Sequence, residues 1–252
     1  SNLVSMIYLK NNSEIDKLYH AGQIVKDTLL MIEEYIVPGV TTMDLDKIAE
    51  EFIISKKAKP GFKGLYGYPA TLCTSVDDEV VHGIPNDVPL KEGQILGIDV
   101  GSLYDSFYGD HAKTFCIGSV SAEKKRLLEV TEECLYLGIE EAKCGNTIGD
   151  IGYAVQNNAE QHGYSVVRDL VGHGIGQKLH EEPQVPNFGL KGTGPLIKPG
   201  LCLAIEPMIN CGSFEVYTKD DNWTICTKDG KPSAHFEHSI AIMEKEVKIL
   251  TK

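Results

Sequence analysis

The sequence repeats itself at long range, and this repetition limits the folds that the chain can adopt. Residues 39–45 (GVTTMDL) reappear as residues 145–151 (GNTIGDI), and the pattern of residues 91–99 returns at 198–206. The offset is 106 or 107 residues in each case, and the order is preserved. Repeated motifs at one offset predict a fold that is built from two similar halves.

The predicted domain organisation follows from this repeat. We place one catalytic domain at 13–252, with halves at roughly 13–118 and 119–252, because no linker rich in Pro, Ser or charge separates them. Residues 1–12 are expected to form an N-terminal extension without a signal-peptide pattern. Ser1-Asn2, ahead of the internal Met6, is interpreted as a cloning remnant.

The composition excludes several classes of protein. The 252 residues carry a formal net charge of −12 without a cluster of Lys and Arg, so nucleic acid and anionic membranes are not expected as partners. No apolar run approaches the roughly 18 residues of a membrane-crossing helix. Seven cysteines without a Cys-x-x-Cys pair argue against a disulfide framework and favour reduced thiols in the cytoplasm.

Capping signals predict two helices at the start of each half. We expect Ser13 to open the first helix and Pro38-Gly39 to end it. Two Thr-x-x-Asp capping boxes, at 41–44 and 147–150, predict the second and fourth helices, and Ser121 predicts the start of the third. Strands are predicted at 72–74, 95–103, 110–117, 166–167, 201–209, 224–227 and 235–243. This order predicts an α+β fold.

Acidic residues inside apolar strands indicate a metal site. A buried carboxylate costs several kcal/mol unless it is paired or bound to a metal, and Lys113 is the only nearby base in the sequence. Carboxylates with one imidazole form a set that favours Mn, Fe(II) or Co(II), and their number suggests two ions. The candidate ligands are Asp99, Asp110, His173, Glu206 and Glu237.

Several motifs together resemble those of type I methionine aminopeptidases. They are Val81-His82-Gly-Ile-Pro85, Ile98-Asp99-Val100, Tyr108-Gly-Asp110, Gly172-His173-Gly-Ile-Gly176, the segment His180–Asn187, Ile205-Glu206-Pro207 and Phe236-Glu237-His238. The resemblance runs from about Ser13 to the end. It implies the pita-bread (creatinase/aminopeptidase) fold, in which an antiparallel sheet in two pseudo-two-fold halves is covered by helices. It also implies removal of the initiator methionine from nascent proteins whose second residue is small.

The resemblance implies a role for each site residue. Asp110 and Glu237 would bridge two divalent ions, Asp99 would bind one, and His173 and Glu206 would bind the other. A water held between the ions would attack the peptide. The resemblance further assigns catalytic roles to Glu206 as proton shuttle, to His180 as the group that steadies the oxyanion, and to His82 near the leaving nitrogen. The partners would be nascent N-termini, at the ribosome, and the enzyme a cytoplasmic monomer.

The methionine pocket implied by the same resemblance departs from the family at Leu179, where an aromatic residue is common. Its expected lining is Tyr68, Cys73, His82 and Trp223, with Phe62 and Leu65 at the rim. His111 also departs, since a small residue is usual there. Some relatives bind a monovalent cation at the positions of Asp78, Val80 and Ser233. His20, His162 and His235 lie outside the motifs and are interpreted as structural.

Two other readings stay open at this stage. Prolidases and proline-specific aminopeptidases share the fold but carry an added N-terminal domain, and type II methionine aminopeptidases carry a helical insertion before the second acid. Here only 33 residues separate His173 from Glu206, and four of the intervening residues are prolines. A non-catalytic binding relative would be expected to have lost ligands, whereas all five candidates are present.

Overall fold

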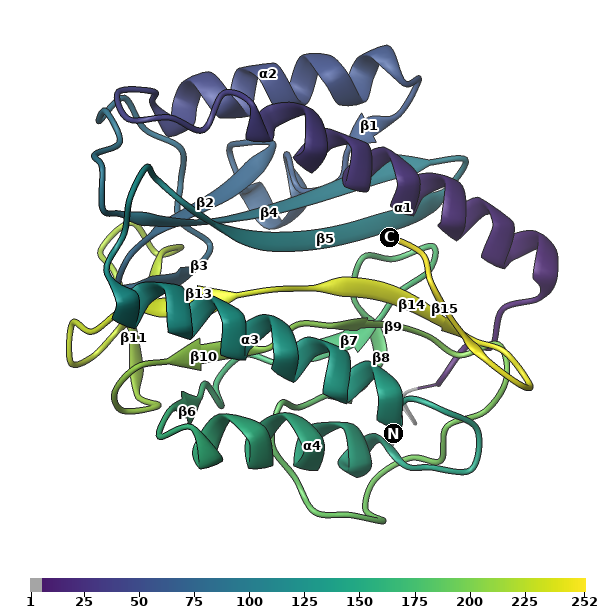
Figure 1. The fold of residues 1–252 in the computed structure, drawn as a ribbon. Helices are drawn as coiled ribbons and strands as arrows, with labels where there is room; N and C mark the ends of the chain where they lie inside the picture. The colour runs from purple at the N-terminus through teal and green to yellow at the C-terminus, as the bar shows by residue number, and fades with distance from the viewer. Residues whose placement is uncertain (1–5) are drawn as a thin grey trace.

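The computed structural model describes residues 6–252, so the interpretation of Ser1-Asn2 lies outside the described residues. Two helices and then several strands follow one another twice along the chain (Figure 1). The helices are α1 (Asn12–Glu33), α2 (Thr42–Ser55), α3 (Ala122–Glu141) and α4 (Ile148–Gln161), with a short 3-10 turn, η1 (Leu65–Gly67). No helix among residues 6–252 has both the length and the apolar character that crossing a bilayer requires.

Three of the four helices begin where the capping signals predict. Thr41, Ser121 and Thr147 are the N-caps of α2, α3 and α4. The prediction for α1 is wrong, because the side chain of Asn11, not Ser13, accepts from the backbone of Glu14 while the Glu14 carboxylate accepts from the Asn11 amide. An acid three residues after Asn11 completes a reciprocal capping box.

The end of α1 also differs from the prediction. The helix stops at Glu33, and a turn in which the Tyr35 amide donates to the Ile32 carbonyl leads the chain to Pro38. The residue before a proline avoids helical backbone angles, so a helix ends ahead of the proline and not at it.

The first half is organised around a long antiparallel hairpin. Strands β4 and β5 pair along their full length, from Ile95↔Cys116 to Tyr104↔Phe107. Strands β1 and β2 pair with the other edge of β4, and α1 packs on the hairpin. The strands of this half are β1 (Lys59–Pro60), β2 (Leu72–Val76), β3 (Glu79–Val81), β4 (Ile95–Tyr104) and β5 (Phe107–Cys116).

The second half has shorter strands, and its largest sheet has the order β15-β14-β9-β7-β8. Two smaller sheets have the orders β13-β10-β6 and β11-β12-β3. The strands are β6 (Ser165–Val166), β7 (Gly172–Gly174), β8 (Glu181–Val185), β9 (Cys202–Ile205), β10 (Met208–Asn210), β11 (Val216–Thr218), β12 (Ile225–Thr227), β13 (Ser233–His235), β14 (His238–Ile242) and β15 (Val247–Ile249).

Two predicted long strands are interrupted in the structure. The strand predicted at 201–209 divides into β9 and β10 at Glu206-Pro207, where proline has no amide hydrogen to continue the ladder. The strand predicted at 235–243 divides into β13 and β14 at Phe236-Glu237. Glu237 instead exchanges backbone hydrogen bonds with Ala112 of β5, which joins the two halves.

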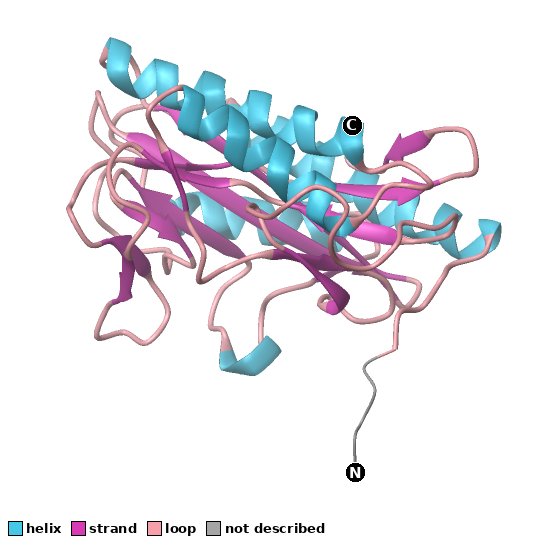
Figure 2. Cartoon of the chain, turned by 90° about the horizontal axis from the view of Figure 1, so that it is seen from below, coloured by secondary structure: helices cyan, strands magenta, loops and turns pink. Residues whose placement is uncertain are grey.

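Each half has its own apolar core between helices and strands. Ile32, Leu45 and Leu96 are fully buried in the first, and Leu127 and Ile151 in the second. In Figure 1, β5 and β14 run side by side between the two pairs of helices. Seen from below, the long loops gather on the side of the strands that faces away from the helices at the top of the view (Figure 2). This arrangement leaves the junction of the halves as the place where side chains from both can meet.

Candidate metal centre and adjoining pocket

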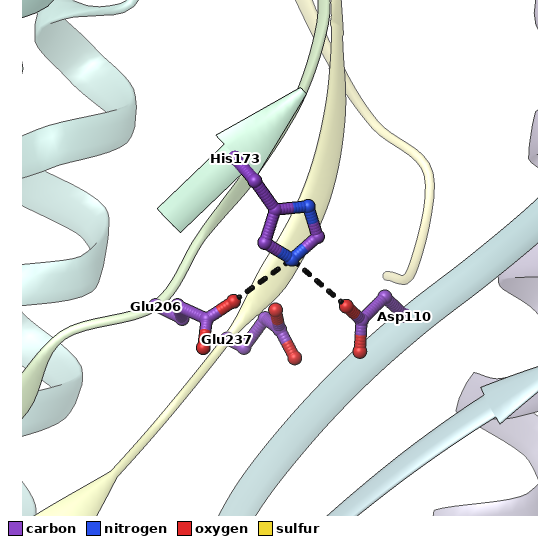
Figure 3. A group of neighbouring side chains, drawn as sticks. All are labelled: Asp110, His173, Glu206 and Glu237. Carbon is purple, nitrogen blue, oxygen red and sulfur yellow. Dashed lines mark ion pairs between the residues drawn. The ribbon is translucent and has the colours of Figure 1, made fainter. Parts of the chain in front are cut away.

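Four of the predicted ligands form one cluster at the junction of the halves. Asp110, His173, Glu206 and Glu237 each offer a ligand atom, and these atoms all lie within 4.8 Å of one another. The Nε2 atom of His173 lies 3.3 Å from Oδ2 of Asp110 and 3.2 Å from Oε2 of Glu206 (Figure 3). Two of these residues lie on strands, Asp110 on β5 and His173 on β7, and Glu206 and Glu237 lie between strands, so both halves of the chain contribute.

A second group overlaps the first and contains a residue that the sequence analysis missed. Asp99, His235 and Glu237 also bring ligand atoms within 4.8 Å, so Glu237 is common to both groups. His235, interpreted from sequence as structural, places Nε2 3.5 Å from Oε1 of Glu206. Its position two residues before Glu237 was the available signal, because residues i and i+2 of a strand share a face.

The β4–β5 hairpin sets the positions of the two aspartates. Gly101 pairs with Asp110, and Asp99 pairs with Ala112. Asp99 and Asp110 are therefore diagonal neighbours on one face of the hairpin. The turn that fixes this register is Asp105-Ser106, with φ of 48° and 69°, as a two-residue hairpin turn requires.

In the second half, glycines allow His173 to lie close to neighbouring backbone. A Cβ on Gly172 would lie 2.4 Å from the carbonyl oxygen of Ala204, and one on Gly174 2.3 Å from that of Glu182. Nδ1 of His173 lies 2.9 Å from the Gly174 carbonyl, which directs Nε2 towards the carboxylates.

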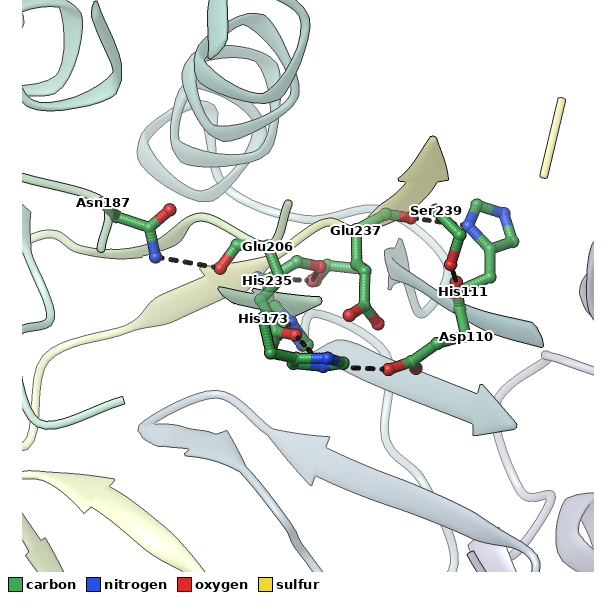
Figure 4. A network of polar contacts seen from close by, with 9 residues as sticks. Asp110, His111, His173, Asn187, Glu206, His235, Glu237 and Ser239 are labelled. Carbon is green, nitrogen blue, oxygen red and sulfur yellow. Dashed lines mark hydrogen bonds and ion pairs between the residues drawn. The ribbon is translucent and has the colours of Figure 1, made fainter. Parts of the chain in front are cut away.

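Glu206 is held through its backbone beside the break after β9. Its carbonyl accepts a hydrogen bond of 3.1 Å from Nδ2 of Asn187, and Ser239 and His111 bond to the backbone of Asp110 and Glu237 (Figure 4). Hydrogen bonds to the main chain leave the carboxylates free to face the cluster. The sequence analysis assigned none of these three supporting residues to the site.

The buried carboxylates lack the partners that they would need without a cation. Oδ1 of Asp99, Oδ1 of Asp110 and both oxygens of Glu237 are buried without a hydrogen-bond partner. Lys113 offers no compensation, since its Nζ lies over the ring of Phe115. Burial, reinforced by the neighbouring Asp110, raises the pKa of Asp99 and of Glu237 well above the usual range. The donor set fits divalent cations, which would satisfy these oxygens and remove the repulsion.

The predicted pocket residues line one cavity of about 120 Å³ that reaches the cluster. Tyr68 donates a hydrogen bond of 2.7 Å to the Leu72 carbonyl, and its ring stacks on Trp223 at 5.1 Å. Tyr66, which the sequence analysis did not select, lines the mouth and stacks over His180 at 6.3 Å. The lining residues include Phe62, Leu65, Tyr68, Cys73, His82, Leu179, His180 and Trp223.

The surroundings of the two histidines beside the cavity, His82 and His180, disfavour their protonated forms. Burial lowers the pKa of His82 and of His180, and for His180 the neighbouring His173 adds to this effect. His111 points away from the cluster, yet its Nδ1 lies 2.6 Å from the carbonyl oxygen of Glu237 and its ring stacks on His238 at 4.8 Å. A cation near Asp78, Val80 and Ser233 stays a prediction.

Known proteins with a similar sequence and fold include metallopeptidases. The model of metallopeptidase family M24 matches residues 16–244. A methionine aminopeptidase of Clostridium perfringens is 51% identical over 246 residues, which cover 98% of this chain and 99% of the relative. The crystal structure of methionine aminopeptidase from Rickettsia prowazekii aligns with a TM-score of 0.97 and 41% identity, over 98% of this chain and 100% of that chain.

A more distant likeness defines the fold alone. Prolidase from Pyrococcus furiosus aligns with a TM-score of 0.79 at 22% identity, over 97% of this chain but 65% of its own length. Together with the aminopeptidase structure, it confirms the predicted pita-bread fold. The chain shares its fold and sequence pattern with a family of metal-dependent hydrolases. This relationship explains why the buried carboxylates fit divalent cations. The chain belongs to metallopeptidase family M24.

Proposed function

We propose that this chain is a methionine aminopeptidase that removes an N-terminal methionine when the next residue is small. The proposal rests on the observation that a cluster of buried acids and an apolar cavity adjoin one another. A cluster of unpartnered carboxylates, centred on Glu237, opens into an apolar cavity lined by Cys73 and Trp223. The cluster supports hydrolysis, and the cavity supports selection of one apolar side chain.

Two divalent ions fit the overlapping ligand groups. Glu237 belongs to both groups, Asp99 to one, and Asp110, His173 and Glu206 to the other, so these five residues would hold the two ions. When bound, Mn, Fe(II) or Co(II) would supply Lewis-acid catalysis and lower the pKa of water. His235 belongs to the second group and would orient Glu206, since its Nε2 is 3.5 Å from Oε1 of that residue.

The protein's own groups would move the proton and bind the peptide. Glu206 lines the cavity and touches the cluster, so its carboxylate can take a proton from water and deliver it to the leaving amine. His180 faces the same cavity, and a neutral ring can donate an N–H to the developing oxyanion. His82 would contact the substrate backbone near the leaving nitrogen.

The pocket suits a thioether. Sulfur makes favourable contacts with aromatic edges, and Tyr68 and Trp223 provide two rings while Cys73 provides a small polarisable wall. Burying an unpaired charge there would cost far more than the roughly 1–3 kcal/mol by which one methylene discriminates. Leu179 is smaller than an aromatic residue and leaves this side of the cavity wider.

The setting of the reaction follows from the proposed substrate. The partners would be the N-termini of nascent polypeptides as they leave the ribosome. We further propose that the enzyme works in the cytoplasm as a monomer, in agreement with its reduced cysteines.

A competition among short peptides tests the function. Met-Gly, Met-Ala, Met-Leu, Met-Lys and acetyl-Met-Gly are mixed with the manganese-loaded enzyme, and products are measured by mass spectrometry. Met-Gly and Met-Ala should be cleaved first, and the acetylated peptide should remain intact. Cleavage of the acetylated peptide at a comparable rate would contradict the proposal. A preference for proline at the second position without a demand for methionine would indicate a proline-specific peptidase instead.

A further inference from the structure

The segment that carries His180 packs into the core through Ile175 and Leu179, but the His180 side chain itself is not part of that core. Residues 175–180 connect β7 to β8 at the edge of the largest sheet. The His180 ring makes no hydrogen bond to any residue of 6–252, and its aromatic neighbours are the rings of His173 and Tyr66. The position of this ring therefore depends on the backbone of the loop, and on whatever holds that backbone.

A buried ion pair from the other end of the chain holds it. Nζ of Lys10 lies 2.5 Å from Oε1 of Glu181, and the two side chains are only 5% and 8% exposed. The other carboxylate oxygen of Glu181 accepts a hydrogen bond of 3.2 Å from the backbone amide of Lys178. The same carboxylate thus ties Lys10 to both ends of the segment 178–181, and Leu179 and His180 lie between those ends.

The surrounding backbone is shaped to admit this pair. A Cβ on Gly176 would lie 2.6 Å from both Oε2 of Glu181 and Cε of Lys10. The backbone amide of Lys10 donates to the carbonyl of Gly200 at 2.8 Å, which ties the lysine to the end of the loop that leads into β9. Nζ also donates to the carbonyl of Tyr8 at 2.9 Å. The backbone of Lys10 and its ammonium group are therefore each held by a main-chain carbonyl, in addition to the contact with Glu181.

The residues before Lys10 extend this attachment along the loop. We name residues 6–10 the N-terminal strap. Ile7 forms a parallel bridge with Glu182, and Met6 and Tyr8 line a second cavity, of about 530 Å³, together with His180 and Glu206. The strap thus lies against the same loop, on the side of the site where that cavity opens.

We propose that Lys10 and Glu181 are positioning residues, which set the loop so that Leu179 closes the pocket and His180 faces the scissile peptide. This inference rests on the proposed function for its kinetic consequence, but not for its structural one. Displacing a catalytic group by about 1 Å can cost about 10²-fold in rate. Breaking the pair should therefore lower kcat while the metal ligands, none of which lies in the segment 178–181, keep their arrangement.

Two variants test the proposal in the full-length, manganese-loaded enzyme. Lys10→Met removes the ammonium and keeps the chain length, and should lower kcat on Met-Ala-Ser by about 10²-fold with little change in manganese affinity. Lys10→Met/Glu181→Gln removes both charges, so that no buried charge is left unpaired. The double variant should regain the urea midpoint of the parent protein but keep the low kcat. Amide hydrogen exchange of residues 176–182 should accelerate in both.

The matched control is Lys124→Met, which breaks a partly buried pair with Asp77 (2.9 Å) far from the loop. It should lower the urea midpoint without changing kcat or the exchange of residues 176–182. Recovery of kcat in the double variant, or an equal loss of kcat in Lys124→Met, would show that the pair only stabilises the fold. Native exchange in Lys10→Met would equally overturn the proposal. An inactive parent enzyme would refute the proposed function but leave the exchange result valid.

Discussion

The two halves of the molecule deliver their ligands to the cluster by different means. Asp99 and Asp110 stand on two continuous ten-residue strands, β4 and β5, which pair along their whole length. Glu206 and Glu237 stand where strands break, after β9 and before β14. His173 occupies a strand of three residues between two glycines. The first half is thus a rigid platform, and the second presents side chains from strand ends.

This difference indicates a division of labour. Asp99 is paired with both neighbouring strands, β2 and β5, and Asp110 is paired with β4, which suits residues whose task is to hold ions. Glu206 lines both cavities of the site, so substrate can reach it. In each half, a pair of helices with similar capping signals precedes the strands. The breaks in the predicted strands, after β9 and before β14, both occur in the second half. Proton transfer should therefore depend on the second half, and ion binding on both.

Removal of the ions should have the largest effect on activity, since both halves contribute unpartnered oxygens to the cluster. Stripped protein should lose all turnover of Met-Ala-Ser, and Mn, Fe(II) or Co(II) should restore it. Activity and metal content are measured on the same samples, with Mg as the control ion. Full activity of a sample whose metal content is verified as nil would refute a metal-dependent mechanism.

Glu206→Gln should have the next largest effect. The amide cannot accept and pass on a proton, and loss of a general acid–base group costs about 10²–10⁴-fold in rate. Steady-state kinetics should place the loss mainly on kcat, with the fold intact by circular dichroism. Glu129→Gln on the exposed face of α3 is the matched control and should behave as the parent. A near-native kcat for Glu206→Gln would mean that another group transfers the proton.

The two buried acids should make the metal-free protein lose stability as pH rises. Burial raises the folded-state pKa of Asp99 and Glu237, so above about pH 4 these groups bind more protons in the folded state than in the unfolded state. The lowered pKa of His82 and of His180 acts in the opposite direction, with or without metal. Urea denaturation at pH 5 and pH 8 is therefore measured with and without saturating Mn, and the change in the free energy of unfolding from pH 5 to pH 8 should be more negative in the metal-free sample. The same change in both samples would contradict the raised pKa values.

The smallest effect should distinguish the two capping boxes. The Thr41 hydroxyl accepts from the Asp44 amide at 3.0 Å, whereas the Thr147 hydroxyl donates to the Asp150 carboxylate at 3.2 Å. Thr41→Ala should therefore destabilise the protein by about 1 kcal/mol, and Thr147→Ala by less. Urea denaturation of both variants measures the difference. Equal losses would mean that the two helix starts are equivalent in energy.

Sequence alone predicted the elements that depend on local signals. Three N-caps and the five candidate ligands could be read from short motifs, since a cap needs only residues three apart. The break before β14 could not be read in this way, because the partner of Glu237 is Ala112 in the other half. Contacts across the chain were missed for the same reason. The break after β9 did have a local signal, Pro207, which the prediction of one strand at 201–209 overlooked.

Two particular residues show this limit. His235 was interpreted as structural because no motif contains it, yet it lies beside Glu206. Lys10 lies within the predicted extension, but its partner Glu181 is 171 residues away. Neither contact has a local signature. The alternation of a strand offered a signal for His235, and none existed for Lys10.

The two-residue turn at Asp105-Ser106 has a consequence for insertions. One added residue at this turn would shift the pairing of β5 against β4 by one position, and a one-residue slip turns every side chain of a strand to the opposite face. Asp110 would then face the helices, and its neighbour His111 would face the cluster. Most surface loops tolerate changes of length, but here the length of the turn determines the identity of a candidate ligand.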